Sequence, residues 1–274
     1  MSSEPPKAIF VTGAASGIGK YLANSFADRG DRVFCTDIDL ASMHTWVEDR
    51  GEAPGTIVTR RLDVRRPEDW KEAVDEAVRT FGRIDVLLNV AGYLRPGYVA
   101  EVSTEDVDMH FDVNAKGVVY GTREAAKTMV ERGCGHIINV GSLASLTPVP
   151  GLSLYGASKF AVRGFSLSAA EELRPRGVDV SVVLLDAVRT PMLDRQAGFE
   201  EAALTFSGPR PLELEEVEAL IDDVMARRPL EVTLPRQRGL VARLAGFVPD
   251  ISRLVAPLLR RRGEQAQSEY ESSR

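Results

Sequence analysis

The chain has 274 residues, of which 44% are hydrophobic and 27% are charged, and its formal net charge at pH 7 is −6. This acidic excess argues against an electrostatically driven nucleic-acid binder, because such proteins present a basic surface. The two cysteines, Cys35 and Cys134, lie far apart and have no Cys-x-x-Cys or histidine-rich context. Neither a disulfide framework nor a metal site is therefore predicted.

The N-terminal residues lack the basic patch and apolar run of a secretory signal, and no apolar stretch approaches the length of a membrane span. The default expectation is a cytoplasmic protein.

Short runs rich in β-branched residues alternate with longer amphipathic stretches along the chain. Seven strands are predicted, at residues 8–12, 32–36, 56–62, 84–89, 136–140, 178–185 and 230–234. Helices are predicted between them, at residues 19–30, 67–82, 104–133, 155–174 and 213–228. Most of the strands are nearly continuous in apolar residues, which is typical of a parallel sheet covered by helices on both faces. The pattern predicts a doubly wound α/β fold in one domain, residues 1–235.

Residues 190–211 are polar, contain two glycines and show weak periodicity. We interpret this segment as a loop with a short helix, placed between a strand end and the next helix, where a lid would lie.

The first predicted strand leads into a glycine-rich loop, Thr12-Gly-Ala-Ala-Ser-Gly-Ile-Gly19, which opens a predicted helix. Glycines at positions 13, 17 and 19 permit a tight turn and a close approach to a pyrophosphate, which then lies against the unpaired amides of the helix N-terminus. An ordinary glycine-rich turn would have the same composition, so this loop alone leaves both interpretations open.

Acidic residues end the second and third predicted strands. Asp37 lies where a carboxylate can accept hydrogen bonds from both hydroxyls of an adenosine ribose. A carboxylate there repels a 2′-phosphate, and no Lys or Arg occurs at residues 14–17 or directly after Asp37, so NAD is favoured over NADP. Asp39 is a weaker candidate for the same contact. Asp63 could reach an adenine amino group or serve only as a turn residue.

Three further residues suggest chemistry. Tyr155 and Lys159 lie one helical turn apart, thirteen residues after Ser142. Residues at i and i+4 share one helix face, so a phenol and an ammonium can point into the same cleft. Taken singly, each has a structural explanation, as a packing aromatic, a surface charge or a turn residue. The three histidines have no partner pattern, and a structural role is predicted for His44, His110 and His136.

Over residues 7–235 these motifs resemble the short-chain dehydrogenase/reductase superfamily, single-domain NAD(P)-dependent oxidoreductases with a Rossmann fold. The resemblance rests on the glycine loop, the acid after the second strand, Asn-x-Ala-Gly at 89–92, and the serine, tyrosine and lysine in order. It implies a catalytic tetrad of Asn114, Ser142, Tyr155 and Lys159. It implies cofactor contacts from Gly13, Ser16, Gly17, Ile18, Gly19, Asp37, Asp63, Val64, Asn89, Ala91, Gly92, Tyr155, Lys159, Val188 and Thr190.

Two positions depart from the superfamily pattern. Val90 replaces an asparagine that mostly supports the central strand, and little consequence is expected. After the sixth strand, Leu185 and Asp186 stand where the superfamily has Pro-Gly. A carboxylate near the nicotinamide would favour its cationic oxidised form. We therefore expect the native protein to prefer NAD⁺ over NADH more strongly than an Asp186→Gly variant.

The resemblance implies that Tyr155 acts as the general acid/base of hydride transfer between an alcohol and a ketone. Lowering a phenol pKa from about 10 to about 7 requires roughly 4 kcal/mol. One ammonium at about 4 Å with an effective dielectric constant near 20 supplies about that much. Lys159, helped by the cationic nicotinamide, is expected to provide this charge and to bind the nicotinamide ribose. Ser142 is expected to hold the substrate oxygen, and Asn114 to position a water that links Lys159 to solvent.

The presumed substrate cleft is apolar. Its wall between Ser142 and Tyr155 is predicted to include Leu143, Leu146, Val149, Pro150 and Leu152, and its lid Met192, Leu193 and Phe199. A hydrophobic secondary alcohol or ketone fits this lining better than a sugar or a small acid.

The tail, residues 236–274, has a different composition from the rest of the chain. Residues 236–262 contain seven arginines and one acid, a net charge of +6, which leaves −12 elsewhere. Apolar residues recur there at helix-like intervals, with Pro249 and Pro257 as expected breaks or kinks. We predict a basic amphipathic helical extension followed by a disordered end. It could cover the cleft, pack on a partner subunit, or attach peripherally to an anionic membrane.

The predicted function is an NAD-dependent short-chain alcohol dehydrogenase or carbonyl reductase, which acts on a small hydrophobic substrate as a homodimer or homotetramer. The alternative is a non-catalytic NAD-binding protein that senses the cofactor or interacts through its tail.

Overall fold

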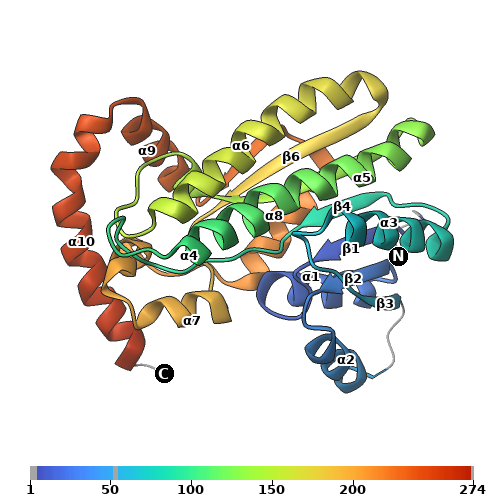
Figure 1. The fold of residues 1–274 in the computed structure, drawn as a ribbon, viewed down its shortest axis with the longest axis horizontal. Helices are drawn as coiled ribbons and strands as arrows, with labels where there is room; N and C mark the ends of the chain where they lie inside the picture. The colour runs from blue at the N-terminus through green and yellow to red at the C-terminus, as the bar shows by residue number, and fades with distance from the viewer. Residues whose placement is uncertain (1–4, 52–54, 273–274) are drawn as a thin grey trace.

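The computed structural model describes residues 5–51 and 55–272, and its centre is a seven-stranded parallel sheet (Figure 1). The strand order is β3-β2-β1-β4-β5-β6-β7, so the chain reverses its direction of travel across the sheet between β1 and β4. The doubly wound fold is confirmed. The strands are β1 (Ala8–Thr12), β2 (Arg32–Asp37), β3 (Thr56–Arg61), β4 (Val86–Asn89), β5 (Gly135–Ser142), β6 (Val178–Leu185) and β7 (Glu231–Leu234).

Helices cover both faces of the sheet, as the apolar strands require. Successive residues of β1 point to opposite faces: Ile9 and Val11 join the cluster under α1, α2 and α8, while Phe10 joins Phe34 and Trp70 in the cluster under α3, α5 and α6. The helices are α1 (Gly17–Asp28), α2 (Leu40–Asp49), α3 (Pro67–Phe81), α4 (Thr104–Met109), α5 (Gly117–Arg132), α6 (Ser153–Leu173), α7 (Pro191–Ala197), α8 (Leu214–Arg227), α9 (Arg236–Phe247) and α10 (Pro249–Ser272).

Helix α2 is absent from the sequence prediction. Only two of its residues, Met43 and Trp46, are buried, which is too few to give a periodic apolar pattern. Tertiary contacts stabilise it instead, since the Trp46 indole donates a hydrogen bond to the Ala14 carbonyl over 3.0 Å. Asp39, the weaker candidate for ribose binding, caps this helix by accepting hydrogen bonds from the Ser42 amide and hydroxyl.

The helix predicted over residues 104–133 is interrupted. A π-helical segment, His110–Lys116, separates α4 from α5. Such widened turns re-aim side chains and occur often at functional sites. The segment contains Asn114, and no local sequence signal predicts the extra residue in the turn.

The segment predicted as a lid contains α7 and a 3₁₀ segment, Glu200–Ser207. The predicted disordered end of the tail is wrong over the described residues, because α10 continues through Pro257 to Ser272. Buried contacts order it. The Gln267 amide donates hydrogen bonds to the Ala197 and Phe199 carbonyls over 2.6 and 2.8 Å, and the Tyr270 hydroxyl donates to Asp194 over 2.7 Å.

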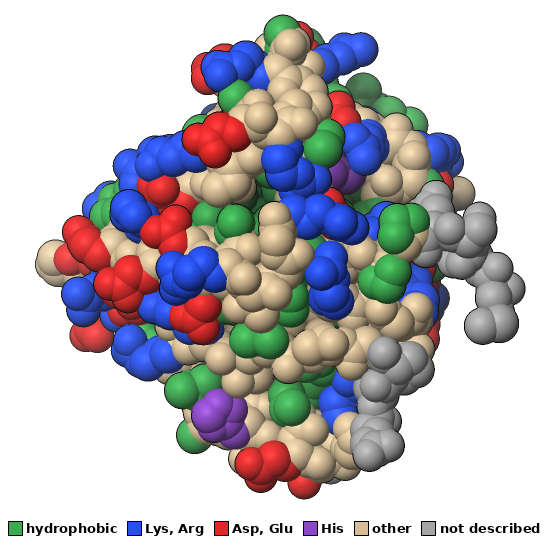
Figure 2. Space-filling view, turned by 90° about the vertical axis from the view of Figure 1, so that its right-hand side faces the viewer, with side chains coloured by type: hydrophobic (Ala, Val, Ile, Leu, Met, Phe, Trp, Pro, Cys, Tyr) green, Lys and Arg blue, Asp and Glu red, His purple; other side chains and the backbone are tan. Residues whose placement is uncertain are grey.

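The tail lies at one end of the molecule, at the left in Figure 1, and the β2–β3 side of the sheet lies at the other. Figure 2 shows the right-hand face, away from the tail, where acidic and basic side chains are interspersed and hydrophobic side chains form only small separate groups.

Candidate active site

A cavity of about 1160 Å³ lies at the carboxyl ends of the strands, the usual ligand-binding edge of such a sheet. Its lining comes from the β1–α1 loop, from the ends of β2 to β6, and from the lid and the tail. One cavity therefore combines the predicted nucleotide loop with the predicted catalytic residues.

The glycine loop has the shape that its sequence predicts. Gly13 has φ +71°, and a Cβ there would lie 2.9 Å from the Ala91 Cα. A Cβ on Gly19 would overlap the Gly13 carbonyl. The Thr12 hydroxyl accepts hydrogen bonds from the Val90 and Ala91 amides over 3.0 and 3.1 Å, which fixes the first loop against the end of β4. Only glycine allows the backbone segments to pack this closely at these positions, and a dinucleotide cradle has the same requirement.

Asp37 lies at the rim of this cradle. One of its carboxylate oxygens accepts a hydrogen bond from the Ala15 amide over 3.0 Å, and the other accepts one from the Asp39 amide over 3.0 Å. Asp37 and Ile38 both line the cavity. The carboxylate is thus held against the glycine loop.

Asp63 lines the cavity but is already bound by Arg65. The guanidinium donates to both carboxylate oxygens, over 2.8 and 2.6 Å, and the Arg65 amide adds a hydrogen bond over 3.1 Å. The side-chain hydrogen bond from Arg65 holds the pKa of Asp63 below its usual range. The turn role considered from the sequence is therefore present, and any contact with an adenine would be shared with Arg65.

Tyr155 and Lys159 project from the first turns of α6 toward the end of β5. The Ser142 side chain hydrogen-bonds to the Tyr155 phenol and accepts a hydrogen bond from the Ala144 amide over 3.1 Å. The buried Lys159 ammonium donates to the Val140 carbonyl over 2.9 Å and lies 5.7 Å from the centroid of the Tyr155 ring. The three residues share one wall of the cavity.

Burial shifts the pKa values of both Tyr155 and Lys159 away from their ordinary values. Burial raises the pKa of Tyr155 to about 12, and the hydrogen bond from Ser142 only partly opposes this shift. Burial also lowers the pKa of Lys159 to about 8.

Asn114 lies behind this wall and does not line the cavity. Its amide oxygen accepts a hydrogen bond from the Tyr93 amide over 2.7 Å, and its nitrogen donates to the Tyr93 carbonyl and the Ser158 hydroxyl over 2.8 and 3.0 Å. The side chain thus ties the loop after β4 to α6. These contacts hold the helix that carries Tyr155 and Lys159.

Asn89, the remaining predicted cofactor contact, does not line the cavity. It is buried in the sheet and donates to the Asn139 side chain over 2.8 Å. The other predicted site residues all line the cavity: Gly13, Ser16, Gly17, Ile18, Gly19, Asp37, Asp63, Val64, Ala91, Gly92, Ser142, Tyr155, Lys159, Val188 and Thr190.

Comparison with known proteins identifies this arrangement. The short chain dehydrogenase family profile matches residues 7–200, which include the glycine loop, Ser142, Tyr155 and Lys159. The chain belongs to the short chain dehydrogenase family. It is therefore an oxidoreductase of that family.

Similar members include a 3-oxoacyl-[acyl-carrier-protein] reductase from Thermotoga maritima, which is 35% identical over 69% of this chain and 77% of its own length. A 3-alpha-(or 20-beta)-hydroxysteroid dehydrogenase from Mycobacterium bovis is 36% identical over 69% of this chain and 71% of its own length.

Two solved short chain dehydrogenases share the fold. One from Burkholderia phymatum, in complex with NAD, has a TM-score of 0.79 at 26% identity and covers 92% of this chain and 97% of its own. One from Sphingobium yanoikuyae, in complex with NADPH, has a TM-score of 0.75 at 28% identity and covers 92% and 95%. Both nicotinamide cofactors thus occur on this fold.

Asp186, which departs from the superfamily pattern, is not an isolated charge. It forms an ion pair of 2.5 Å with Arg238 of α9. Burial raises the pKa of Asp186, and Arg238 opposes this shift. Arg238 also donates to the Ser207 hydroxyl over 3.5 Å, so the pair joins the end of β6, the lid and the tail. Because Arg238 compensates the carboxylate, the basis for the predicted preference for NAD⁺ over NADH is weakened. No sequence motif indicated this partner.

Val90, the other departure, is partly buried and packs against the hydrophobic core between the sheet and α1, as its supporting role predicts.

The part of the cavity beyond Ser142 and Tyr155 is largely apolar. Leu146 and Phe199 were predicted to line it and do not, because Leu146 packs in the core and Phe199 is exposed. The tail instead contributes side chains that sequence reasoning did not assign to the cleft. The apolar lining includes Leu143, Val149, Pro150, Leu152, Met192, Leu193, Leu204, Val241, Ala242, Ala245, Ala256 and Leu259.

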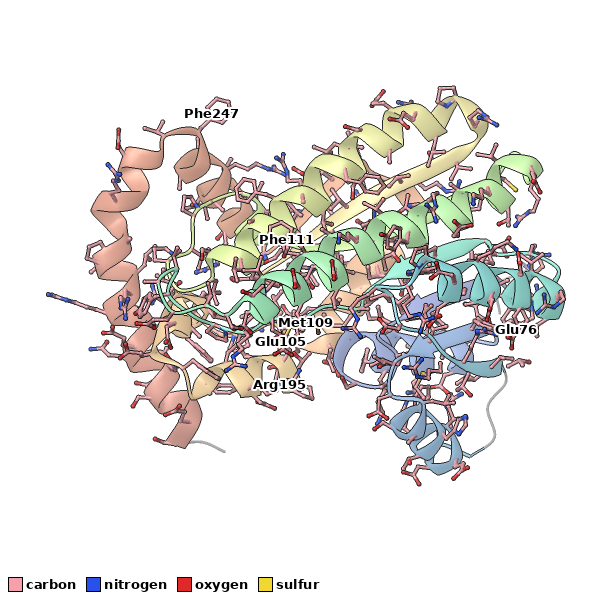
Figure 3. All side chains as sticks on the ribbon, viewed as in Figure 1. Glu76, Glu105, Met109, Phe111, Arg195 and Phe247 are labelled. Atoms are coloured by element: carbon pink, nitrogen blue, oxygen red, sulfur yellow. The ribbon has the colours of Figure 1, made fainter. Side chains whose placement is uncertain are left out.

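Arg195, on α7, and Met109, at the end of α4, also line the cavity, and Figure 3 labels both residues. Within residues 5–51 and 55–272, no cluster of three or more His, Cys, Asp or Glu side chains could hold a metal ion. In the same described ranges, no helix is both long enough and apolar enough to cross a membrane.

Proposed function

We propose that the protein is an NAD-dependent oxidoreductase that interconverts a hydrophobic secondary alcohol and its ketone. The observation that carries this proposal is that Tyr155, Ser142 and Lys159 lie on one wall of the cavity that the glycine loop also enters. Hydride transfer at a carbinol carbon needs a proton moved on its oxygen, and a phenol beside the cofactor site can move it.

The residues present fit a nicotinamide dinucleotide. The glycine loop leaves room for a pyrophosphate at the N-terminus of α1, and Asp37 is held at the rim by the Ala15 amide. A bound nicotinamide supplies the hydride acceptor and, when oxidised, a positive charge. Asp37 supports NAD over NADP, since a carboxylate repels a 2′-phosphate.

Each catalytic side chain then has a defined task. Ser142, already in contact with the phenol, orients the substrate oxygen toward Tyr155. Tyr155 accepts the alcohol proton in oxidation and returns it in reduction. The charge of Lys159, together with that of an oxidised nicotinamide, would lower the pKa of the phenol from about 12. Asn114 is a positioning residue, since it joins the loop after β4 to α6 through Tyr93 and Ser158.

The substrate class follows from the apolar lining beyond Tyr155. Such walls favour a steroid-like, lipid-derived or aromatic alcohol over a sugar, because burying hydroxyl groups without partners is unfavourable. The named activities of the two similar enzymes, on a 3-oxoacyl group and on a hydroxysteroid, also concern carbonyl or hydroxyl groups on hydrophobic compounds. A homodimer or homotetramer is the proposed assembly.

The decisive experiment compares the native protein with Tyr155→Phe over a panel of hydrophobic secondary alcohols, following NADH absorbance, with NAD⁺ and NADP⁺ in parallel. The variant should retain cofactor binding and lose on the order of 10²- to 10⁴-fold in turnover, the usual contribution of a general acid/base. Unchanged turnover in the variant would exclude Tyr155 as the proton donor. Tight cofactor binding by a native protein that oxidises nothing would favour the non-catalytic alternative.

A further inference from the structure

The surface of α9 is unusual for a helix packed on a protein core. Leu240, Val241, Leu244 and Phe247 follow an i, i+1, i+4, i+7 spacing, which places them on one face of the helix. All four are exposed, by 58, 64, 61 and 90% respectively, and Val248, directly after the helix, is 47% exposed. We call these five residues the apolar tail face. A globular helix normally turns such a stripe toward the core.

Small residues occupy the inward side of α9 instead. A Cβ on Gly239 would overlap Thr233 of β7, and a Cβ on Gly246 would overlap the Leu146 carbonyl. Ala242, between them, is buried. The helix is thus fixed closely to the protein through glycine and alanine, and the large apolar side chains are left on its outer side. Rotating α9 to bury its large apolar side chains would break the close contacts of Gly239 and Gly246 with Thr233 and Leu146.

Exposed apolar side chains are concentrated in this part of the molecule. Of the twelve large hydrophobic side chains that are exposed among the described residues, seven lie between positions 240 and 259. Phe247 stands at the turn between α9 and α10 and points away from the body of the protein (Figure 3). Contiguous apolar surface of this kind usually marks a contact with a partner or a membrane.

Unpaired positive charge lies on the same two helices, α9 and α10. Arg236, Arg261 and Arg262 form no ion pair with any described residue, and all three are exposed. Arg253 is also exposed and lies 3.6 Å from Asp250. A second copy meeting this surface across a two-fold axis would bring like charges together. The charge favours an anionic partner over another copy of the same chain.

We propose that the apolar tail face and the unpaired arginines of α9 and α10 bind the surface of an anionic lipid bilayer. The apolar side chains would enter the boundary between headgroups and acyl chains, and the guanidinium groups would lie among the anionic headgroups. Val241 and Leu259 line the cavity as well, so this surface adjoins the apolar end of the candidate active site. The inference concerns binding to lipid and does not depend on the proposed activity.

Co-sedimentation of the full chain with vesicles tests this inference. We expect the protein to pellet with mixed phosphatidylglycerol and phosphatidylcholine vesicles at low ionic strength, to bind more weakly at high ionic strength, and to bind weakly to phosphatidylcholine alone. The Leu244→Ser/Phe247→Ser variant should lose roughly 100-fold in partition coefficient. Leu230→Ser, at an exposed leucine before β7, is the control and should bind like the native protein.

A second variant isolates the charge. Removing three free arginines in Arg236→Gln/Arg261→Gln/Arg262→Gln should reduce binding on the order of 100-fold, at about fivefold per arginine. Arg79→Gln/Arg174→Gln/Arg176→Gln changes the net charge equally at exposed positions outside the tail and should bind normally.

Three results would overturn the proposal. One is no pelleting with the mixed vesicles at low salt. Another is pelleting that both sets of tail variants leave unchanged. The third is a native protein that does not bind lipid and a Leu244→Ser/Phe247→Ser variant that has a lower mass than the native protein by analytical ultracentrifugation. That result would identify the apolar tail face as an interface between copies.

Discussion

The two ends of the cavity are built in different ways. At the cofactor end, the lining comes from consecutive short segments, and its shape is set by backbone conformation at glycines and by Asp37 bound to the loop that it faces. At the substrate end, the lining comes from residues more than a hundred positions apart, brought together by α7, the lid, α9 and α10. The first region is recognisable as a local motif. The second exists only when the tail docks on the domain.

The largest effect is expected from steric blockage of the cofactor end. Gly19→Ala places a methyl group on the Gly13 carbonyl and should weaken NAD⁺ binding by more than about 100-fold, measured by calorimetry. Gly164→Ala is the matched control in α6, because a Cβ there meets nothing within 4 Å. Normal cofactor affinity of Gly19→Ala would show that the loop does not cradle the dinucleotide.

The next effect concerns the ion pair that joins the two regions. Arg238→Met removes the partner of the buried Asp186 and should destabilise the protein by about 3 kcal/mol at neutral pH in denaturant unfolding. Without Arg238 the pKa of Asp186 rises further, so the folded state binds this proton more tightly than the unfolded state. The deficit relative to the native protein should therefore shrink as the pH falls toward 4.

The double variant Asp186→Asn/Arg238→Met controls for this interpretation. It leaves no buried charge and should recover most of the lost stability. A deficit that is the same at pH 4 and pH 7 would exclude the unpaired carboxylate as its cause.

Titration of His136, near the amino end of β5 and therefore away from the cavity, tests whether both regions unfold as one cooperative unit. Burial lowers the pKa of His136 to about 4, and its ring hydrogen-bonds to the Ser181 hydroxyl over 2.9 Å. The folded state therefore resists protonation, and stability should fall by about 3 kcal/mol as the pH drops from about 6.5 to about 4. His136→Asn should remove this dependence. Separate acid transitions for cofactor release and for α10 would contradict a single unit.

The smallest effect is expected from the tail docking itself. A Cβ on Gly263 of α10 would overlap the Ala203 carbonyl, so Gly263→Ala should cost about 1–3 kcal/mol and expose α10 to proteolysis. NAD⁺ affinity should change little, because the glycine loop and Asp37 belong to β1, α1 and β2 rather than to the tail. Gly198→Ala, where a Cβ meets nothing within 4 Å, is the control. Equal loss of cofactor affinity in Gly263→Ala would contradict the separation of the two regions.

Much of the fold and cofactor end could be predicted from the sequence, because the signals are local. All seven strands were predicted from apolar runs, and the glycine loop predicted the positions where a side chain has no room. Helix α2 was missed because it has no periodic apolar pattern. Its Trp46 is held instead by a hydrogen bond to the Ala14 carbonyl, which is distant in the sequence. The side-chain direction of Asn89 was not predictable, because a polar residue at a strand end can point into the sheet as well as into the crevice.

The sequence by itself determined which chemistry-bearing residues occur and in what order: the glycine loop, Asp37, Ser142, Tyr155 and Lys159. Only the tertiary structure decided their environment. It buries Tyr155 and Lys159 enough to move both pKa values, pairs Asp186 with Arg238, and turns the apolar side of α9 outward. The physical reason is that desolvation, ion pairing and helix docking depend on contacts between segments far apart in the chain, which spacing along the sequence does not encode.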